Sequence, residues 1–120
     1  MEQHYHDASD RRFAAHLRRG APGEFKGFMA LNAAAARTDG AVPIKYRELM
    51  SVAIALTTQC VYCIETHVAA AKAAGASMEE IAETVFVAAA MRAGGAVAHG
   101  RLAIKLFERA EADEPRAHTA

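Results

Sequence analysis

The balance between helix-forming and helix-breaking residues is the feature that most limits how this chain can fold. Roughly a quarter of the residues are alanine, the strongest helix former, whereas proline occurs only three times. The sequence has neither Asn-Gly turns nor clusters of β-branched residues, and apolar residues recur with a four-residue spacing. It therefore predicts an all-α protein, a bundle of about six helices in a single domain.

The helix boundaries are predicted from capping and breaking residues. Pro22 and Pro43 suit the first turn of a helix, and Ser77 and Glu80 have the spacing of a capping box. Breaks are expected at Gly20, Asp39-Gly40, Gly75 and Gly94-Gly95. The resulting helices cover residues 10–19, 22–38, 43–58, 60–75 and 77–92, with a sixth that follows Gly94-Gly95 and ends near residue 111.

The length of 120 residues favours one domain. We expect an N-terminal helical segment over residues 1–24, a core domain over 25–112 and a polar tail over 113–120. The net charge is zero, so neither nucleic acid nor an anionic membrane is expected as a partner. The polar N-terminus does not resemble a signal peptide, and no run suggests a membrane span, so a cytoplasmic location is expected.

The stretch CVYCIETH holds the only two cysteines of the chain. On a helix that begins near Cys60, the side chains of Cys60, Cys63 and His67 share one face. The positive end of the helix stabilises a thiolate there. Two neighbouring cysteines can then exchange a thiolate for a disulfide, while His67 transfers protons.

Of three other interpretations of the pair, zinc binding and a purely structural role stay open, whereas covalent haem is excluded. Zinc could bind Cys60, Cys63 and His67, but a structural zinc site needs a fourth ligand, and we expect no metal. Attachment of c-type haem needs a histidine directly after the second cysteine, where Ile64 stands. The cysteines could also be two buried apolar side chains without chemistry.

Glu48 is a further candidate, because it lies in a helix that is otherwise apolar downstream. A glutamate in this position is usually a solvated residue near the helix start. However, the predicted helices 43–58 and 60–75 are joined by almost nothing and must pack together. Glu48 could then reach His67 and orient it as a base.

The predicted helix 77–92, quoted with its flanking glycines as IAETVFVAAAMRAGG, has little polar surface along its second half. It could be the central helix of a monomeric bundle. In so small a domain, however, such a helix favours burial by another subunit. We therefore expect a homo-oligomer.

Taken together, these motifs resemble those of the AhpD-like alkylhydroperoxidases, members of the carboxymuconolactone decarboxylase superfamily. The resemblance covers about residues 25–108. It is carried by Pro43-x-Lys45-x-x-Glu48-Leu49, by Cys60-x-x-Cys63-x-x-x-His67 and by Gly75-x-Ser77-x-x-Glu80-Ile81. One departure is Tyr62, since peroxidases of this family often have histidine before the second cysteine.

The resemblance implies an all-helical, thiol-dependent peroxidase that reduces hydroperoxides through a redox-active disulfide and no other cofactor. It gives Cys63 the role of peroxidatic thiolate and Cys60 that of resolving thiol, with His67 and Glu48 as a proton relay. The implied reductant is an external dithiol or a lipoylated protein. The alternatives are an enzyme similar to the small-lactone decarboxylases and a non-catalytic, redox-sensing helical oligomer. Longer family members contain two related halves and form trimers, so we expect a hexamer of this shorter chain.

Overall fold

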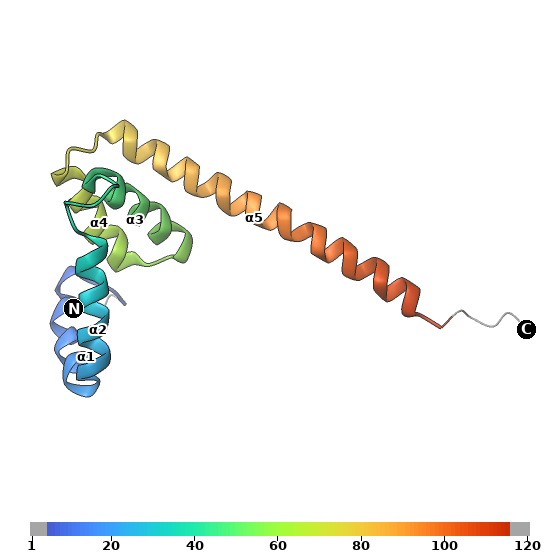
Figure 1. Cartoon of the computed structure of the whole chain (residues 1–120), viewed down its shortest axis with the longest axis horizontal. Coiled ribbons are helices and arrows are strands. Elements are labelled where there is room, and N and C mark those ends of the chain that lie inside the picture. The colour runs from blue at the N-terminus through green and yellow to red at the C-terminus, as the bar shows by residue number, and fades with distance from the viewer. Residues whose placement is uncertain (1–4, 116–120) are drawn as a thin grey trace, which may run out of the picture.

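The computed structural model describes residues 5–115, all of whose regular elements are helices (Figure 1). The elements are η1 (Ala8–Phe13, a 3₁₀ helix), α1 (Ala14–Gly20), α2 (Pro22–Ala35), α3 (Ile44–Thr58), α4 (Val61–Ala73) and α5 (Met78–Asp113). The prediction of an all-α, single-domain fold is confirmed. The outer residues of the segments expected over 1–24 and 113–120 lie outside the described range.

Helix starts follow the predicted signals closely. Pro22 occupies the first turn of α2, and Pro43 is the N-cap of α3. The capping box at the start of α5 is present: the Glu80 backbone N–H donates to Ser77 Oγ at 3.1 Å, and the Ser77 N–H donates to Glu80 Oε1 at 3.0 Å. The helix expected over residues 10–19 is divided into η1 and α1, because Asp7 caps an earlier start at Ala8.

The predicted break at Gly94-Gly95 is wrong. The helices expected on either side of it form the single 36-residue helix α5. Each glycine inside a helix costs about 1 kcal/mol relative to alanine, but it does not force the chain out of the helix. Gly75, in contrast, has φ +95° and does separate α4 from α5. Gly75 ends a helix because its φ is positive, whereas Gly94 and Gly95 continue α5 in helical conformation.

The small core lies where α3 packs against α4 and the first half of α5. Its buried apolar residues are Leu49, Val52, Ala55, Ala71 and Ala88. The second half of α5 projects away from this body (Figure 1). The radius of gyration of 21.9 Å therefore exceeds the value of about 14 Å typical of a compact chain of this length.

The composition of α5 corrects the expectation that no run of the sequence suggests a membrane span. This helix is long and apolar enough to cross a membrane by length and composition alone. Core helices of soluble proteins pass the same test. Within the described chain, only a small share of the apolar stretch is buried.

Arg47 joins the end of α2 to the start of α3. Its guanidinium donates from Nε to the Val42 carbonyl and from Nη1 to the Ala35 carbonyl, both at 2.9 Å. Gly40 lies against this guanidinium: a β-carbon there would collide with Arg47 and lie 3.0 Å from Nε of Arg37. A side chain at position 40 would therefore have to displace the end of the Arg47 side chain.

We expect Gly40→Ala to lower the free energy of unfolding by about 1–2 kcal/mol, because the methyl group displaces the Arg47 guanidinium from its two carbonyl acceptors. Urea denaturation followed by circular dichroism measures the loss. The matched control is the same substitution in an Arg47→Ala background, where it should cost clearly less. Equal losses in both backgrounds would contradict this explanation.

Candidate functional site

The link between α3 and α4 places the motif residues. Gln59 ends α3 in the left-handed conformation with φ 58°, and the Cys60 N–H donates to the Ala55 carbonyl at 3.0 Å. The chain therefore reverses within two residues and α4 begins at Val61. Because the reversal is so tight, α4 packs along α3.

Cys60 and Cys63 form a disulfide at the start of α4, with their Cα atoms 5.2 Å apart. Cys60 is the N-cap residue of the helix, and its Sγ accepts the backbone N–H of Cys63 at 3.2 Å. Sulfur thus takes the place that a serine or aspartate oxygen usually occupies at a helix start. The helix N-terminus would stabilise negative charge on this sulfur after reduction.

Glu48 and His67 form a hydrogen-bonded pair between α3 and α4. His67 Nδ1 and Glu48 Oε2 are 2.6 Å apart, and the side chains are 27% and 7% exposed, respectively. The reading of Glu48 as a solvated residue is therefore wrong, and its carboxylate faces the histidine. When this carboxylate is ionised it can only accept a hydrogen bond, and His67 Nδ1 is then the donor. Nε2 is left available for another partner.

The pair lies next to the disulfide along α4. Cys63 and His67 are four residues apart on the same helix, so their Cβ atoms are separated by about 5–6 Å. Both residues are partly buried. The structure thus pairs Glu48 with His67 and Cys60 with Cys63, and His67 follows Cys63 by one turn of α4.

A contact that the sequence analysis missed joins the N-terminal segment to the cysteine motif. The Tyr62 hydroxyl donates to Asp10 Oδ2 at 2.8 Å, across 52 positions of the chain. Together with residues 5–17, α4 borders a groove of about 870 Å³ whose walls include Phe13, Leu17 and Tyr62. The position of Tyr62 inside the cysteine motif was the only local signal, and it did not identify a partner.

The hydrogen bond to Asp10 raises the pKa of Tyr62, with smaller contributions in the same direction from desolvation and from the charge of Asp10. The folded chain therefore holds the phenol proton to higher pH than an unfolded chain does. The contact is fully present below pH ~10, the ordinary pKa of tyrosine, and is lost as pH rises through the raised pKa.

We expect Tyr62→Phe to loosen η1 at neutral pH, because the ring remains and only the hydrogen bond to Asp10 is lost. Amide hydrogen exchange of residues 7–13 should become faster, while exchange in α3 stays unchanged. In the unmodified chain, the same acceleration should appear only at alkaline pH. Unchanged exchange in the variant would show that the hydrogen bond does not hold this segment.

The cysteine motif does not form a metal-binding group in this structure. Over residues 5–115, no three His, Cys, Asp or Glu side chains are grouped to hold a metal ion. The sulfurs of Cys60 and Cys63 are bonded to each other, and Nδ1 of His67 is engaged by Glu48.

Comparison with known proteins agrees with the fold. Residues 22–106 match the model of the carboxymuconolactone decarboxylase family. A curated relative, "Uncharacterized protein 4 in cox locus" of Paracoccus denitrificans, is 46% identical over 70 residues. The match covers 58% of this chain and 63% of the relative, so the chain spans less than two thirds of that protein.

A solved structure gives independent support for the fold. The apo form of lpg0406, a carboxymuconolactone decarboxylase family protein from Legionella pneumophila, is 32% identical and superposes with a TM-score of 0.63. The similarity covers 84% of this chain and 89% of that one. The resemblance inferred from the sequence motifs is confirmed, and the chain belongs to the carboxymuconolactone decarboxylase family.

Proposed function

We propose that this protein is a thiol-dependent peroxidase that reduces hydroperoxides at the Cys60–Cys63 pair. The observation that carries the proposal is the arrangement at the start of α4. A disulfide occupies the helix N-terminus, and a histidine oriented by a buried carboxylate lies one turn further on. A nucleophile beside an oriented base is typical of thiol catalysis.

In the first step, the Cys63 thiolate attacks one oxygen of the hydroperoxide and the O–O bond breaks. The sulfur is oxidised to sulfenic acid, and the other oxygen leaves as an alkoxide. His67 supplies the proton that converts the alkoxide to an alcohol, and Glu48 stabilises the imidazolium from which it comes. Cys63 is assigned this role because it is one helical turn from His67.

In the second step, the Cys60 thiolate attacks the sulfenic sulfur of Cys63. An S–S bond forms, the S–O bond breaks, and hydroxide leaves as water after taking a proton. In the resulting disulfide the Cα atoms lie 5.2 Å apart, within the usual range for such a bond. The Cys63 N–H that meets Cys60 Sγ favours the attacking thiolate.

An external dithiol then reduces the disulfide. One thiolate of the dithiol attacks Cys63, Cys60 leaves as a thiolate, and the second thiol of the reductant releases Cys63 by forming its own disulfide. Cys60 is the better leaving group because its sulfur lies at the helix N-terminus. The overall reaction consumes one hydroperoxide and one dithiol and yields alcohol, water and a cyclic disulfide. A lipoylated protein has the dithiol chemistry required.

Intact-mass measurement tests the pair directly. Reduced protein treated with one equivalent of tert-butyl hydroperoxide should lose two hydrogens, and dihydrolipoamide should restore them. Cys60→Ser should instead gain one oxygen at Cys63. Oxidation that yields only disulfides between chains would contradict the proposed pairing. Reversible oxidation by other disulfides, but not by peroxide, would favour the redox-sensing alternative.

A further inference from the structure

Tyr62 connects the cysteine motif to the N-terminal segment, a name used here for residues 5–20, which include η1 and α1. It stands between Cys60 and Cys63 in the chain, as the second residue of α4. Its hydroxyl donates to Asp10 Oδ2 at 2.8 Å, and its ring lies perpendicular to that of His6, with the centroids 6.5 Å apart. Both contacts are therefore made by a residue that the disulfide encloses.

The carboxylate of Asp10 that receives the phenol also holds the start of η1 together. Its Oδ2 accepts the backbone N–H of Asp7 at 2.8 Å, which completes the capping box of η1. One oxygen atom thus joins the cap of η1 to the hydroxyl of Tyr62. A displacement of the phenol therefore acts on the hydrogen bonds that begin the helix, and not on a surface side chain alone.

Little else in the described chain attaches the N-terminal segment to α4. The extensive helix contacts of residues 5–115 are those of α3 with α4 and α5, and those of α1 with η1 and α2. Phe13 and Leu17 border the groove of about 870 Å³ between the segment and α4, and they remain 52% and 67% exposed. Apolar burial across the groove is therefore small, and Tyr62 supplies a large share of the attachment.

The disulfide restricts the turn of α4 that carries Tyr62. The first N–H groups of a helix have no acceptor inside it, so this turn is held by the S–S bond and by the Cys63 N–H that donates to Cys60 Sγ. Reduction by a dithiol cleaves the S–S bond and leaves two thiols, while the dithiol becomes a cyclic disulfide. The backbone of residues 60–63 then gains freedom, and holding the phenol against Asp10 costs more conformational entropy.

We propose that the Cys60–Cys63 pair controls the N-terminal segment through Tyr62: the disulfide holds the segment on α4, and reduction releases it. Coupling between two equilibria is reciprocal. If the disulfide favours the attached segment, the attached segment favours the disulfide by the same factor. Tyr62 and Asp10 are thus positioning residues, and their contact makes the pair harder to reduce. The inference requires only that the pair can be reduced, whatever oxidant re-forms it.

The competing explanation is a static anchor, in which the Tyr62–Asp10 contact holds the segment equally well in both redox states. A static anchor and a redox-controlled one have the same structure in the disulfide form, so they differ only after reduction. The alkaline loss of the contact described above concerns the disulfide form, which is the state of this structure. Reduction is a second and separate way to weaken the same contact at neutral pH.

Amide hydrogen exchange of the full chain in its two redox states tests the release. Reduction with excess dihydrolipoamide should accelerate exchange at residues 7–13 about fivefold, the factor for losing one hydrogen bond of ordinary net strength. In Tyr62→Phe, exchange at these residues should be fast in both states, because the contact is absent from each. Equal exchange at residues 7–13 in the two states of the unmodified chain would overturn the proposal.

The equilibrium of the pair with a dithiol tests the reciprocal effect. The protein is equilibrated with mixtures of dihydrolipoamide and lipoamide, and alkylation followed by mass measurement gives the ratio of dithiol to disulfide protein. Tyr62→Phe should shift this equilibrium toward the dithiol by about fivefold, which is ~20 mV in midpoint potential. A static anchor would accelerate exchange in the variant and leave the equilibrium unchanged, and that result would refute the coupling.

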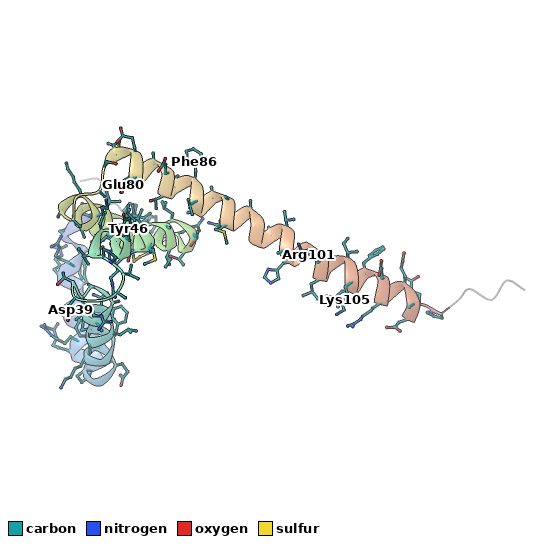
Figure 2. All side chains as sticks on the ribbon, turned by 45° about the horizontal axis from the view of Figure 1, so that its top comes forward. Asp39, Tyr46, Glu80, Phe86, Arg101 and Lys105 are labelled. Carbon is teal, nitrogen blue, oxygen red and sulfur yellow. A yellow bond between two sulfur atoms is a disulfide. The ribbon has the colours of Figure 1, made fainter. Side chains whose placement is uncertain are left out.

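Tyr46→Phe is the matched control, because it removes the same hydroxyl from a tyrosine that is 50% exposed, against 48% for Tyr62. Tyr46 belongs to α3 and lies with Glu80 along a groove between α3 and α5 (Figure 2). Its loss of a hydroxyl should change neither the exchange of residues 7–13 nor the equilibrium with dihydrolipoamide. A shift as large as that of Tyr62→Phe would mean that the effect is not specific to the Asp10 contact.

A double variant tests whether Tyr62 and Asp10 act as one contact. Asp10→Ala removes the acceptor and should shift the equilibrium in the same direction as Tyr62→Phe. The two substitutions together should shift it no further than the larger single effect, because both remove the same hydrogen bond. Additive shifts would contradict the coupling through this bond. None of these measurements contains a hydroperoxide, so they are independent of the outcome for the peroxidase proposal.

Discussion

Replacing Cys63 by serine is expected to reduce peroxide consumption to the rate without enzyme. The hydroxyl of serine is not ionised at neutral pH, so the variant lacks the nucleophile that attacks the O–O bond. Cys60→Ser is the matched control, because it removes the same atom type from the same pair. It should still react once with peroxide and then stop at the sulfenic acid, since the resolving thiol is missing.

A sulfenic-acid reagent such as dimedone distinguishes the two cysteines. Under peroxide it should label Cys60→Ser at position 63 and leave Cys63→Ser unlabelled. This labelling experiment is needed because the helix N-terminus and the His67 base favour different sulfurs as the attacking thiolate. The helix N-terminus acts on Cys60, whose Sγ meets the Cys63 N–H, whereas His67 is one turn from Cys63. Labelling of Cys60 in Cys63→Ser alone would reverse the roles.

Removing the carboxylate of Glu48 is expected to slow the oxidation of Cys63 by about a hundredfold, within the usual range for losing acid–base assistance. In Glu48→Ala, the His67 Nδ1 loses its partner at 2.6 Å, and the carboxylate no longer orients the ring. Stopped-flow measurement of the first turnover reports this step without interference from the reductant.

Glu48→Gln is the control for packing, because the amide keeps the volume of a side chain that is only 7% exposed. It can still accept a hydrogen bond from Nδ1 but carries no charge, so it should retain more activity than Glu48→Ala. Thermal unfolding of both variants shows whether the fold is kept. Equal first-turnover rates in Glu48→Ala, Glu48→Gln and the unmodified chain would remove Glu48 from the mechanism.

The sequence allowed the local structure to be predicted well because its signals are local. Capping residues such as Ser77 with Glu80, and prolines at helix starts, act within one turn of the chain. The prediction of a helix break at Gly94-Gly95 was wrong, because it assumed that glycine residues end a helix whatever their backbone conformation. A glycine ends a helix only where the chain adopts a positive φ, as Gly75 does, and one sequence does not reveal that choice.

The candidate site could be predicted in part, for a similar reason. Cys60, Cys63 and His67 lie within eight positions of one helix, so helical geometry alone places them on one face. Glu48 required a further step, the packing of α3 on α4, which the very short link at Gln59 made almost unavoidable. The Asp10–Tyr62 contact joins positions 52 apart and depends on the path of the whole N-terminal segment. No local pattern encodes such a contact.

The central claim, that the Cys60–Cys63 pair cycles between dithiol and disulfide at the expense of hydroperoxide, is tested most directly by steady-state turnover. Purified full-length protein is supplied with tert-butyl hydroperoxide and an excess of dihydrolipoamide, and both compounds are followed over time. We predict sustained consumption of the two in equal amounts, abolished by Cys63→Ser. Consumption no faster than with that variant, while the disulfide is still reduced by dihydrolipoamide, would contradict the account.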